Sequence, residues 1–545
     1  MSPLDYFLQW EKQQPNRIFL RQPLNGRWRT WTWAEAGQEC RRVAAALAES
    51  NLEPGDHVAI LSKNCAHWIM ADIAIMMAGC VSIPIYPTLT SGTIRNILEH
   101  SDTRAIFVGK LDDYEEQRQG IPSSVIRIGC STYGTQEQNS WEEIQRKHTP
   151  LAQVHTWKCD DILTIVYTSG TTGRAKGVMH NACTFDTVFR QVAPILNVPV
   201  NPNMFSYLPL SHVAERLAVE MNVIFNCGTA SFSESLSTFA QDLESVQPDA
   251  FFAVPRIWTK FRESILKKFS QQKLDLLLSI PLVSTLVKKA VRQKLGLSRA
   301  RIILSAAAPI SMDLLHWYDR LGITIYQAYG MTEDSVYAHF NRAGSNRFGS
   351  VGRPLPGLQV KFSQQGEICV KSPGNFVGYY KEPGLTAEVF DEDGYLLTGD
   401  KGEYDGDGYL YITGRIKDQF KTDKGKYISP APIELSLLAG EDIEQACVVG
   451  MGIPQPIVLV NLSEQGRNKS KDVLIKSLSD TLSSVNERLD NFEQVRKVVI
   501  TRDEWTVGNG MMTPTLKIRR NELEALHLHR YAEWFDRIDT VIWED

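Results

Sequence analysis

The chain has 545 residues, of which 43% are hydrophobic and 22% are charged, and its formal net charge is −5. One hydrophobic core rarely supports this length, so at least two domains are expected. The weakly acidic balance gives no general reason to expect nucleic acid as a partner.

Nine cysteines are spread along the chain, and no two of them have a C-x-x-C spacing. Their odd number and their apolar or mixed surroundings argue against a disulfide framework and against a zinc site, and predict buried free thiols in a reducing compartment. The first 21 residues include Asp5, Glu11 and Lys12 and lack the apolar core of a signal peptide. The sequence therefore predicts a cytoplasmic protein.

Helix and strand patterns alternate along most of the chain. Residues 32–50 predict a helix in which Thr32 is the N-cap and Glu35 completes a capping box. Further elements follow the same rhythm: a strand at 57–61, a helix at 91–101 and a strand at 105–108. Such alternation is typical of mostly parallel sheets covered by helices.

Residues 68–87 are the best candidate for a membrane span. Asp72, Pro84 and Pro87 interrupt this stretch, its first half has helical spacing, and residues 81–85 have the pattern of a strand. The stretch therefore predicts a buried helix and strand instead of a transmembrane helix.

The pattern changes at Gly349. From 349 to 414 the chain consists of short strands and turns, which predicts a β-rich subdomain with strands at 359–362, 366–370 and 409–412. After Arg415 a mixed pattern returns, with strands at 446–450 and 494–500 and a helix at 471–490. We predict an α/β protein with a large N-terminal domain of mixed or parallel sheets at 1–415 and a small C-terminal α/β domain at 416–545.

An apolar strand at 161–166 runs directly into a segment rich in glycine, serine and threonine. Backbone N–H groups and hydroxyls in such a segment can face phosphate oxygens, and Lys176 adds a positive charge at its end. The spacing is not that of a Walker loop, and a surface turn is the structural alternative. The candidate phosphate contacts are Thr168, Ser169, Gly170, Thr171, Thr172, Gly173 and Lys176.

Residues 167–178 closely resemble the signature of the adenylate-forming superfamily, which includes acyl-CoA synthetases, luciferases and the adenylation domains of peptide synthetases. Ala175 stands where the family usually has proline, a change that loosens the turn without removing a chemical group. The resemblance implies an enzyme that uses ATP and Mg²⁺ and has a mobile C-terminal domain.

Further segments follow in the family's order. Residues 207–216 resemble the second motif in its long-chain acyl-CoA synthetase form, where His212 would shape the carboxylate and acyl pocket; a core histidine is an equally good explanation. Residues 305–309 are similar to the segment that lines adenine, through Ala307 and Ala308, although Ala306 replaces the usual glycine. A helix start at Pro309 explains that segment equally well.

Residues 327–333 carry a stronger resemblance. By this resemblance Tyr329 stacks on adenine, Gly330 follows it, and Thr332 contacts the α-phosphate, while the Glu333 carboxylate is an oxygen ligand that suits Mg²⁺. The structural alternative is a strand end with a solvated glutamate.

Residues 395–400 and 414–418 complete the implied nucleotide site. Asp400 would accept hydrogen bonds from the ribose hydroxyls, and Arg415 would reach ribose or phosphate. The acidic turn at 403–408 imitates the opening of a calcium loop, but Gly414 occupies the twelfth position, so a hairpin turn is predicted instead.

Near the end, residues 509–520 contain a Thr-Pro-Thr-x-Lys pattern that resembles the catalytic-lysine motif of long-chain and bubblegum-type acyl-CoA synthetases. The resemblance implies that Lys517 bridges the carboxylate and the α-phosphate. It also implies that the C-terminal domain rotates between two half-reactions, with Lys417 at the hinge and with Lys424 and Gly425 in the coenzyme A tunnel.

The predicted activity is ATP-dependent ligation of a medium- to long-chain fatty acid to coenzyme A through an acyl-adenylate. Loading of a carrier protein, luciferase-like oxygen chemistry and an inactive acyl- or nucleotide-binding module are the alternatives. The sequence does not determine the length of the acyl chain or whether the protein forms a homodimer.

Residues 260–301 hold eleven Lys and Arg residues but only two acids, within a leucine-rich stretch. Peripheral contact with an anionic membrane is one explanation, and an amphipathic helix pair with a solvated basic face is the other.

Overall fold

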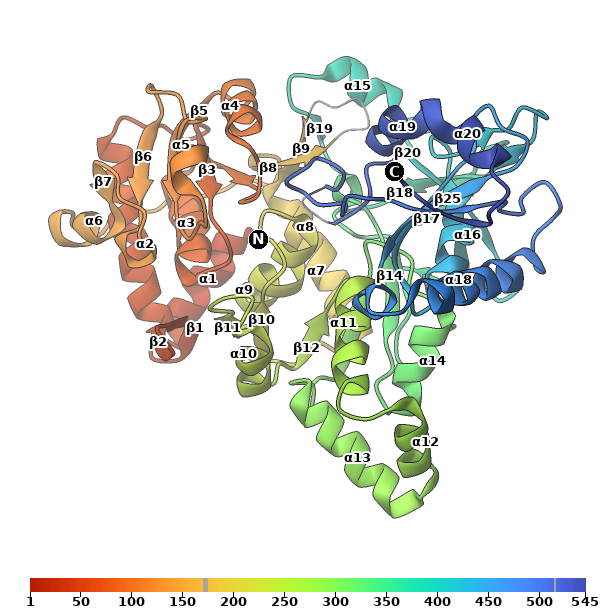
Figure 1. Cartoon of the computed structure of the whole chain (residues 1–545). Coiled ribbons are helices and arrows are strands. Elements are labelled where there is room, and N and C mark those ends of the chain that lie inside the picture. The colour runs from red at the N-terminus through yellow and green to blue at the C-terminus, as the bar shows by residue number, and fades with distance from the viewer. Residues whose placement is uncertain (170–174, 514–515) are drawn as a thin grey trace.

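The computed structural model describes residues 1–169, 175–513 and 516–545, and six sheets form in these residues. Figure 1 shows a large N-terminal part, coloured from red through green to teal, and a smaller C-terminal part in blue. Helices cover the sheets in both parts, which confirms the predicted α/β class with a large N-terminal and a small C-terminal domain.

The sheet with the most strands in the described residues has the order β19-β9-β8-β4-β3-β5-β6-β7. Its strands are β3 (His57–Leu61), β4 (Val81–Ile85), β5 (Thr103–Val108), β6 (Ile126–Gly129), β7 (Asn139–Ser140), β8 (Ile162–Ser169), β9 (Ala175–Asn181) and β19 (Gly378–Tyr379). All pairs from β8 to β7 are parallel, whereas β9 pairs with β8 and β19 in antiparallel fashion. The predicted mostly parallel sheet is confirmed.

The helices that accompany this sheet are α1 (Pro3–Gln13), α2 (Trp33–Glu49), α3 (Ala66–Ala78), α4 (Ser91–His100), α5 (Tyr114–Arg118), α6 (Trp141–Lys147) and α7 (Ala182–Leu196), with a 3-10 turn η1 (Ser131–Tyr133). The predicted capping box of α2 is present, because Thr32 Oγ1 accepts from the Glu35 N–H at 3.2 Å and Glu35 accepts from the Thr32 N–H at 2.8 Å.

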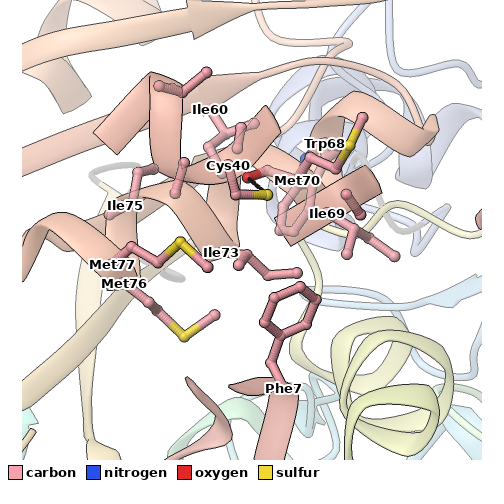
Figure 2. Close-up of a cluster of buried hydrophobic side chains, with 14 of the residues drawn as sticks. Phe7, Cys40, Ile60, Trp68, Ile69, Met70, Ile73, Ile75, Met76 and Met77 are labelled. Carbon is pink, nitrogen blue, oxygen red and sulfur yellow. Dashed lines mark hydrogen bonds between the residues drawn. The ribbon is translucent and has the colours of Figure 1, made fainter. Parts of the chain in front are cut away.

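Helix α3 is buried on all sides, from Ala66 to Met77. Figure 2 shows its side chains Trp68, Ile69, Ile73 and Met76 with Phe7 of α1 in one cluster. A helix that is apolar on all sides belongs either in the core of a protein or in a membrane. None of the helices in the described residues is long and apolar enough to cross a membrane, so the predicted buried helix–strand unit at 68–87 is confirmed.

The prediction of free thiols is wrong for two of the nine cysteines. Cys159 and Cys183 form a disulfide, whereas the other seven cysteines are free and buried. The two partners lie 24 residues apart but flank a hairpin, since β8 and β9 are antiparallel with Ile162 opposite Asn181. The hairpin brings its two ends together, and cysteine spacing alone does not reveal this contact.

Two further sheets complete the N-terminal helical part. One has the order β10 (Asn203–Ser206), β11 (Thr229–Phe232), β1 (Ile18–Leu24) and β2 (Arg27–Thr32), and the other β12 (Ala250–Phe252), β13 (Ile302–Ser305), β14 (Tyr326–Tyr329), β15 (His339–Phe340) and β16 (Arg353–Pro354). Their helices are α8 (Val213–Glu215), the π-helix η2 (Arg216–Met221), α9 (Asn222–Asn226), α10 (Phe239–Val246), α11 (Pro255–Leu266), α12 (Gln271–Ser279), α13 (Pro281–Lys294), α14 (Met312–Arg320) and the 3-10 turn η3 (Thr332–Asp334).

The strands predicted after Gly349 are observed in an antiparallel sheet. Its order is β17 (Gln359–Phe362), β18 (Glu367–Lys371), β20 (Leu396–Tyr404) and β21 (Leu410–Arg415), with α15 (Pro383–Glu388) before β20. The acidic turn between β20 and β21 is the predicted hairpin turn, because Asp405 Oδ1 accepts from the N–H groups of Asp407 and Tyr409 at 3.0 and 2.9 Å.

The chain after Arg415 forms a ribbon of β22 (Phe420–Lys421) and β23 (Tyr427–Ile428) and a sheet of order β24 (Ile443–Val449), β25 (Ile457–Leu462), β26 (Val498–Ile500) and β27 (Val541–Trp543). The helices here are α16 (Pro430–Leu437), α17 (Glu464–Arg467), α18 (Lys471–Asn486), α19 (Arg520–His527) and α20 (Tyr531–Asp536), with the 3-10 turn η4 (Leu528–Arg530). The strand expected at 494–500 begins only at Val498, because the Asn486 side chain donates to the Val495 carbonyl and accepts from its N–H, both at 2.9 Å.

Helix α11 connects the two parts of the molecule through charge. Its basic side chains, and Lys267 just after it, face glutamates that lie after Arg415. The ion pairs are Arg256–Glu444 at 2.7 Å, Arg262–Glu441 at 3.6 Å and Lys267–Glu464 at 2.9 Å.

Candidate active site

The segment predicted to bind phosphate is the connection between two hydrogen-bonded strands. Thr168 on β8 is paired with Lys176 on β9, so the strand residues on either side of the connection lie next to each other. Gly170, Thr171, Thr172 and Gly173 and the side chain of Ser169 lie outside the described residues. The Lys176 Nζ lies 4.9 Å from the centre of the Tyr379 ring.

The segments predicted to line adenine lie at one edge of the second parallel sheet. Strands β13 and β14 are parallel and in register, with Ser305 opposite Gln327. Tyr329 is the last residue of β14, and residues 306–308 and 330–333 follow the two strands at their carboxyl ends, where ligands bind in open α/β sheets. Ala307 adopts a left-handed backbone with φ of 73°, a conformation that glycine tolerates better.

Gly330 has a packing reason to lack a side chain. A Cβ at this position would meet the Cα of Val336 at 2.6 Å, so any larger residue would push apart the turn that carries Thr332 and Glu333. Asp334 organises the same turn by accepting from the Met331 N–H at 2.8 Å. Burial raises the pKa of Asp334 to about 7.

Tyr329 and Arg415 both bind the Asp400 carboxylate. The Tyr329 hydroxyl donates to Oδ2 at 2.9 Å, and the Arg415 Nε donates to Oδ1 at 2.6 Å. Strand pairing places Asp400 directly opposite Arg415 in β20 and β21. The ring of Tyr329 is therefore held in one orientation beside an arginine whose charge remains accessible from solvent.

Glu333 is half-buried and has a partner that the sequence does not suggest. The Tyr379 hydroxyl donates to Glu333 Oε1 at 2.9 Å. Loss of hydration raises the pKa of Glu333, while the charges of Lys176 and Arg415 oppose this rise. The described residues contain no cluster of three or more His, Cys, Asp or Glu side chains that could hold a metal ion by themselves.

Lys517 joins these groups from the C-terminal part of the chain. The residue is exposed, yet the surrounding protein partly desolvates its ammonium and lowers its pKa. Arg415 lowers the pKa further, whereas Asp400 and Glu333 act in the opposite direction. A tight turn holds the residue, since the Lys517 N–H donates to Thr513 Oγ1 at 3.1 Å and its carbonyl accepts from the Thr513 N–H at 2.8 Å.

His212 lies within reach of the charge on Lys517. Burial and then Lys517 lower the pKa of His212 to about 4, so the imidazole is neutral at pH 7. Its Nδ1 accepts from the Ala214 N–H at 3.1 Å, which leaves the proton on Nε2. Glu215 positions the preceding loop by accepting from Ser206 Oγ and from the Tyr207 N–H at 2.9 and 3.0 Å.

The residues predicted for the hinge and the coenzyme A tunnel lie on the surface, after Arg415 in the chain. Lys417, Lys424 and Gly425 are exposed, and within the described residues no hydrogen bond or ion pair links them to Glu333, Asp400 or Lys517. Gly425 forms the turn between β22 and β23 with φ of 79°, and a Cβ there would meet only Lys421 Cε at 3.7 Å. The turn conformation is a sufficient local reason for this glycine.

A buried ionic cluster around Arg216, four residues after His212 in the chain, was missed by sequence reasoning. Arg216, with no exposed side-chain surface, donates to Asp72 Oδ2 at 2.6 Å, to Glu220 Oε2 at 3.1 Å and to Thr164 Oγ1 at 2.8 Å. The cluster therefore joins α3, η2 and β8. The signal was present in the sequence, because an aspartate inside an apolar helix needs a buried cation.

Comparison with known families agrees with this arrangement. The family described as AMP-binding enzyme matches residues 7–380, and its C-terminal domain family matches residues 417–533. A long-chain-fatty-acid–CoA ligase of Mycobacterium bovis is 28% identical and covers 94% of this chain and 93% of its own length. Long-chain-fatty-acid–CoA ligase 6 of Rattus norvegicus is 27% identical and covers 92% of this chain and 82% of its own.

Solved structures share the fold at lower identity. The adenylation domain of a carboxylate reductase from Mycobacterium chelonae superposes with a TM-score of 0.83 at 20% identity, covering 98% of this chain and 91% of its own. An anthranilate CoA ligase in complex with anthranoyl-AMP gives a TM-score of 0.78 at 20% identity, covering 96% and 97%. The two family matches span most of this chain, and the chain belongs to the AMP-binding, adenylate-forming enzyme family.

Proposed function

We propose that this adenylate-forming enzyme ligates a medium- to long-chain fatty acid to coenzyme A, and releases AMP and pyrophosphate. The observation that carries the proposal is the convergence of Lys517, from the C-terminal part, with Glu333, Asp400 and Arg415 of the N-terminal part. A hinge at 414–418 would place the domain boundary between residues 415 and 416.

Charge explains what the residues would do in the first step. A carboxylate and the triphosphate of ATP repel each other, so attack at the α-phosphorus requires positive charge where the negative charge gathers. Lys517 would lie between the carboxylate and the α-phosphate, and Lys176 beside the departing pyrophosphate. His212, neutral with Nε2–H available, would donate a hydrogen bond to the acyl carboxylate or carbonyl.

Asp400 and Tyr329 would orient the nucleoside. The Asp400 carboxylate already accepts from Tyr329 and Arg415, and its remaining acceptor sites suit the two ribose hydroxyls. The Tyr329 ring would stack on adenine, with the backbone of Ala307 and Ala308 along the other side. Thr332 would contact the α-phosphate.

Glu333 fits a magnesium ion that is bound mainly by phosphates. Mg²⁺ in nucleotide sites takes one or two carboxylates together with phosphate oxygens and water, and Glu333 is a half-buried carboxylate whose raised pKa a cation would offset. The ion would supply charge neutralisation for the triphosphate. Tyr379 would keep the carboxylate in position through its bond to Oε1.

Two features support a fatty acid and coenzyme A as the other substrates. Residues 207–216 and 509–517 resemble the long-chain form of their motifs, and the curated relatives named above are long-chain-fatty-acid–CoA ligases. A carrier protein as acyl acceptor is the second candidate, since the most similar structure named above is an adenylation domain of a carboxylate reductase. We place the enzyme in the cytoplasm.

A two-part assay tests the proposal. ATP–pyrophosphate exchange is measured with acetate, octanoate, palmitate, benzoate and an amino acid, and thioester formation is then measured with coenzyme A. We expect exchange to be fastest with octanoate or palmitate and to be followed by acyl-CoA. Fastest exchange with acetate, benzoate or the amino acid would reject the acyl substrate, and exchange without acyl-CoA would reject coenzyme A as acceptor.

A further inference from the structure

Helices α12 and α13 form a hairpin that projects from the body of the protein at the bottom of Figure 1. Four large apolar side chains at or near its tip are exposed: Leu276 by 63%, Ile280 by 45%, Leu282 by 83% and Leu286 by 68%. None of the residues of α13 is fully buried. The other face of α13 packs on the core through Val287, Val291 and Leu295.

This distribution is not that of an ordinary surface helix. Such a helix places apolar residues toward the core and polar residues toward water. The core contact of α13 is already made by Val287, Val291 and Leu295. A second helical row, with Leu282 and Leu286, faces outward. The outward row together with the tip is an apolar surface without a partner among the described residues.

The charge of the hairpin is strongly positive. Residues 267–294 include seven Lys and Arg residues and one acid, Asp275, which forms an ion pair with Arg320. Of the cations, Arg292 is structural, because it donates to the carbonyls of Gly322, Leu297 and Ala300 at 2.8 to 3.1 Å. Lys294 pairs with Glu244 at 2.8 Å.

Four lysines of the hairpin region have no ion-pair partner within the described residues: Lys268, Lys273, Lys288 and Lys289. Lys273 lies seven residues before the tip at Ile280, and Lys288 lies seven residues after Pro281. At 1.5 Å per helical residue, both arms therefore carry free cations at the same height, about 10 Å from the tip.

An apolar tip with a band of cations about 10 Å above it matches the profile of an anionic bilayer. Interfacial helices bury their apolar face about 5–10 Å deep, where lysines reach the phosphate level. We propose that the α12–α13 hairpin is a docking surface for an anionic membrane. Long-chain fatty acids partition into bilayers, so an enzyme docked on the membrane would meet its substrate there. This advantage for catalysis rests on the proposed function.

Flotation of the full-length protein with vesicles tests the surface. The protein is mixed with vesicles of phosphatidylcholine alone, or of phosphatidylcholine with phosphatidylglycerol, in the absence of nucleotide and fatty acid. We expect binding only to the anionic vesicles. The triple variant Lys273→Gln/Lys288→Gln/Lys289→Gln is expected to weaken it about 10²-fold, because each lysine near such a surface contributes roughly fivefold.

Two matched controls separate the hairpin from general charge and hydrophobicity. Lys12→Gln/Lys158→Gln/Lys476→Gln makes the same change in net charge elsewhere on the surface. The apolar variant Leu276→Gln/Leu282→Gln/Leu286→Gln is compared with Val200→Gln/Leu236→Gln/Ile538→Gln, whose residues are 75%, 93% and 98% exposed. Both hairpin variants are expected to lose vesicle binding, and both controls are expected to keep it.

Each result of the flotation experiment either supports or overturns membrane docking by the hairpin. Wild-type protein that fails to float with anionic vesicles, or controls that lose binding as much as the hairpin variants, would overturn the proposal and leave the surface to a protein partner. ATP–pyrophosphate exchange with soluble octanoate, measured without vesicles, is expected to be unchanged in the hairpin variants. Absence of that exchange in wild type would reject the proposed function and leave the vesicle result standing.

Discussion

Replacement of Lys517 by alanine separates the two half-reactions most clearly. The charges of Arg415, Asp400 and Glu333 act on the Lys517 ammonium, and under the proposed function it meets the charge that develops during adenylation. The acyl-adenylate formed in the first step no longer needs this charge. The substitution should therefore slow acyl-adenylate formation and have a much smaller effect on thioester formation.

The magnitude follows from the position of the charge. A unit charge about 4 Å from developing negative charge contributes about 4 kcal/mol at the effective dielectric typical of partly exposed sites. This corresponds to a rate change of about 10³-fold. Loss of one preorganised stabilising group in other enzymes costs about 10²–10³-fold, in the same range.

The assay compares ATP–pyrophosphate exchange with acyl transfer from chemically supplied acyl-adenylate to coenzyme A. Lys517→Ala keeps the backbone N–H that binds Thr513 Oγ1, and Lys517 is an exposed residue, so the fold is expected to persist. Lys476→Ala, an exposed lysine on α18, is the matched control and should leave both rates unchanged. Equal loss of both half-reactions in Lys517→Ala, or unaltered exchange, would refute this reasoning.

Three further predictions concern other parts of the molecule. Gly425→Asn introduces a residue that tolerates the left-handed backbone at φ of 79°. This variant is expected to keep ATP–pyrophosphate exchange and to slow thioester formation about 10²-fold. An equal loss of both rates would contradict the assignment of Gly425 to the coenzyme A tunnel. Glu444→Arg places a cation against Arg256, now 2.7 Å from the glutamate, and is expected to slow adenylation most at low salt. Arg256→Glu in the same chain should restore part of the rate, because Lys260 and Arg467 also lie 3.7 and 3.6 Å from Glu444; absence of any rescue would rule out the Arg256–Glu444 pair as a support of the adenylating arrangement. Burial lowers the pKa of His67 to about 3 in the folded protein, so the unfolded chain binds more protons below pH 6.5 and the free energy of unfolding falls as the pH decreases from 6.5 toward 3. In urea unfolding, His67→Gln should show a smaller loss of stability over this pH range. An unchanged loss of stability would exclude His67 as its source.

The sequence was sufficient for features that depend on neighbouring residues. Thr32 and Glu35 are three residues apart, so the capping box that starts α2 could be predicted and is observed. The segments that form α3, β3 and β5 are continuous apolar runs bounded by turn residues, and these elements lie within a few residues of their predicted positions. The order of the motifs was enough to indicate the superfamily, which the family matches confirm.

Contacts between distant segments could not be predicted in the same way. Tyr379 binds Glu333 across 46 residues, and Arg216 binds Asp72 across 144 residues. No periodicity within a single element connects such pairs, and many other tyrosines or acids would satisfy the same composition. The disulfide between Cys159 and Cys183 was missed for this reason, since it depends on the hairpin of β8 and β9.

By itself the sequence determined the α/β class, the approximate bounds of the elements with the clearest patterns, and the candidate residues for adenylate chemistry, because these follow from local spacing and local propensity. Only the tertiary structure decided that the charges of Asp400 and Glu333 act on Lys517, whereas no hydrogen bond or ion pair in the described residues links Lys417 or Gly425 to them. It also decided that Leu282 and Leu286 face outward, although their row on α13 has the same spacing as the row that packs on the core. The physical reason is the same in both cases: a side chain's neighbours depend on how whole elements pack, and packing minimises the exposed apolar surface of the entire chain instead of that of any single segment.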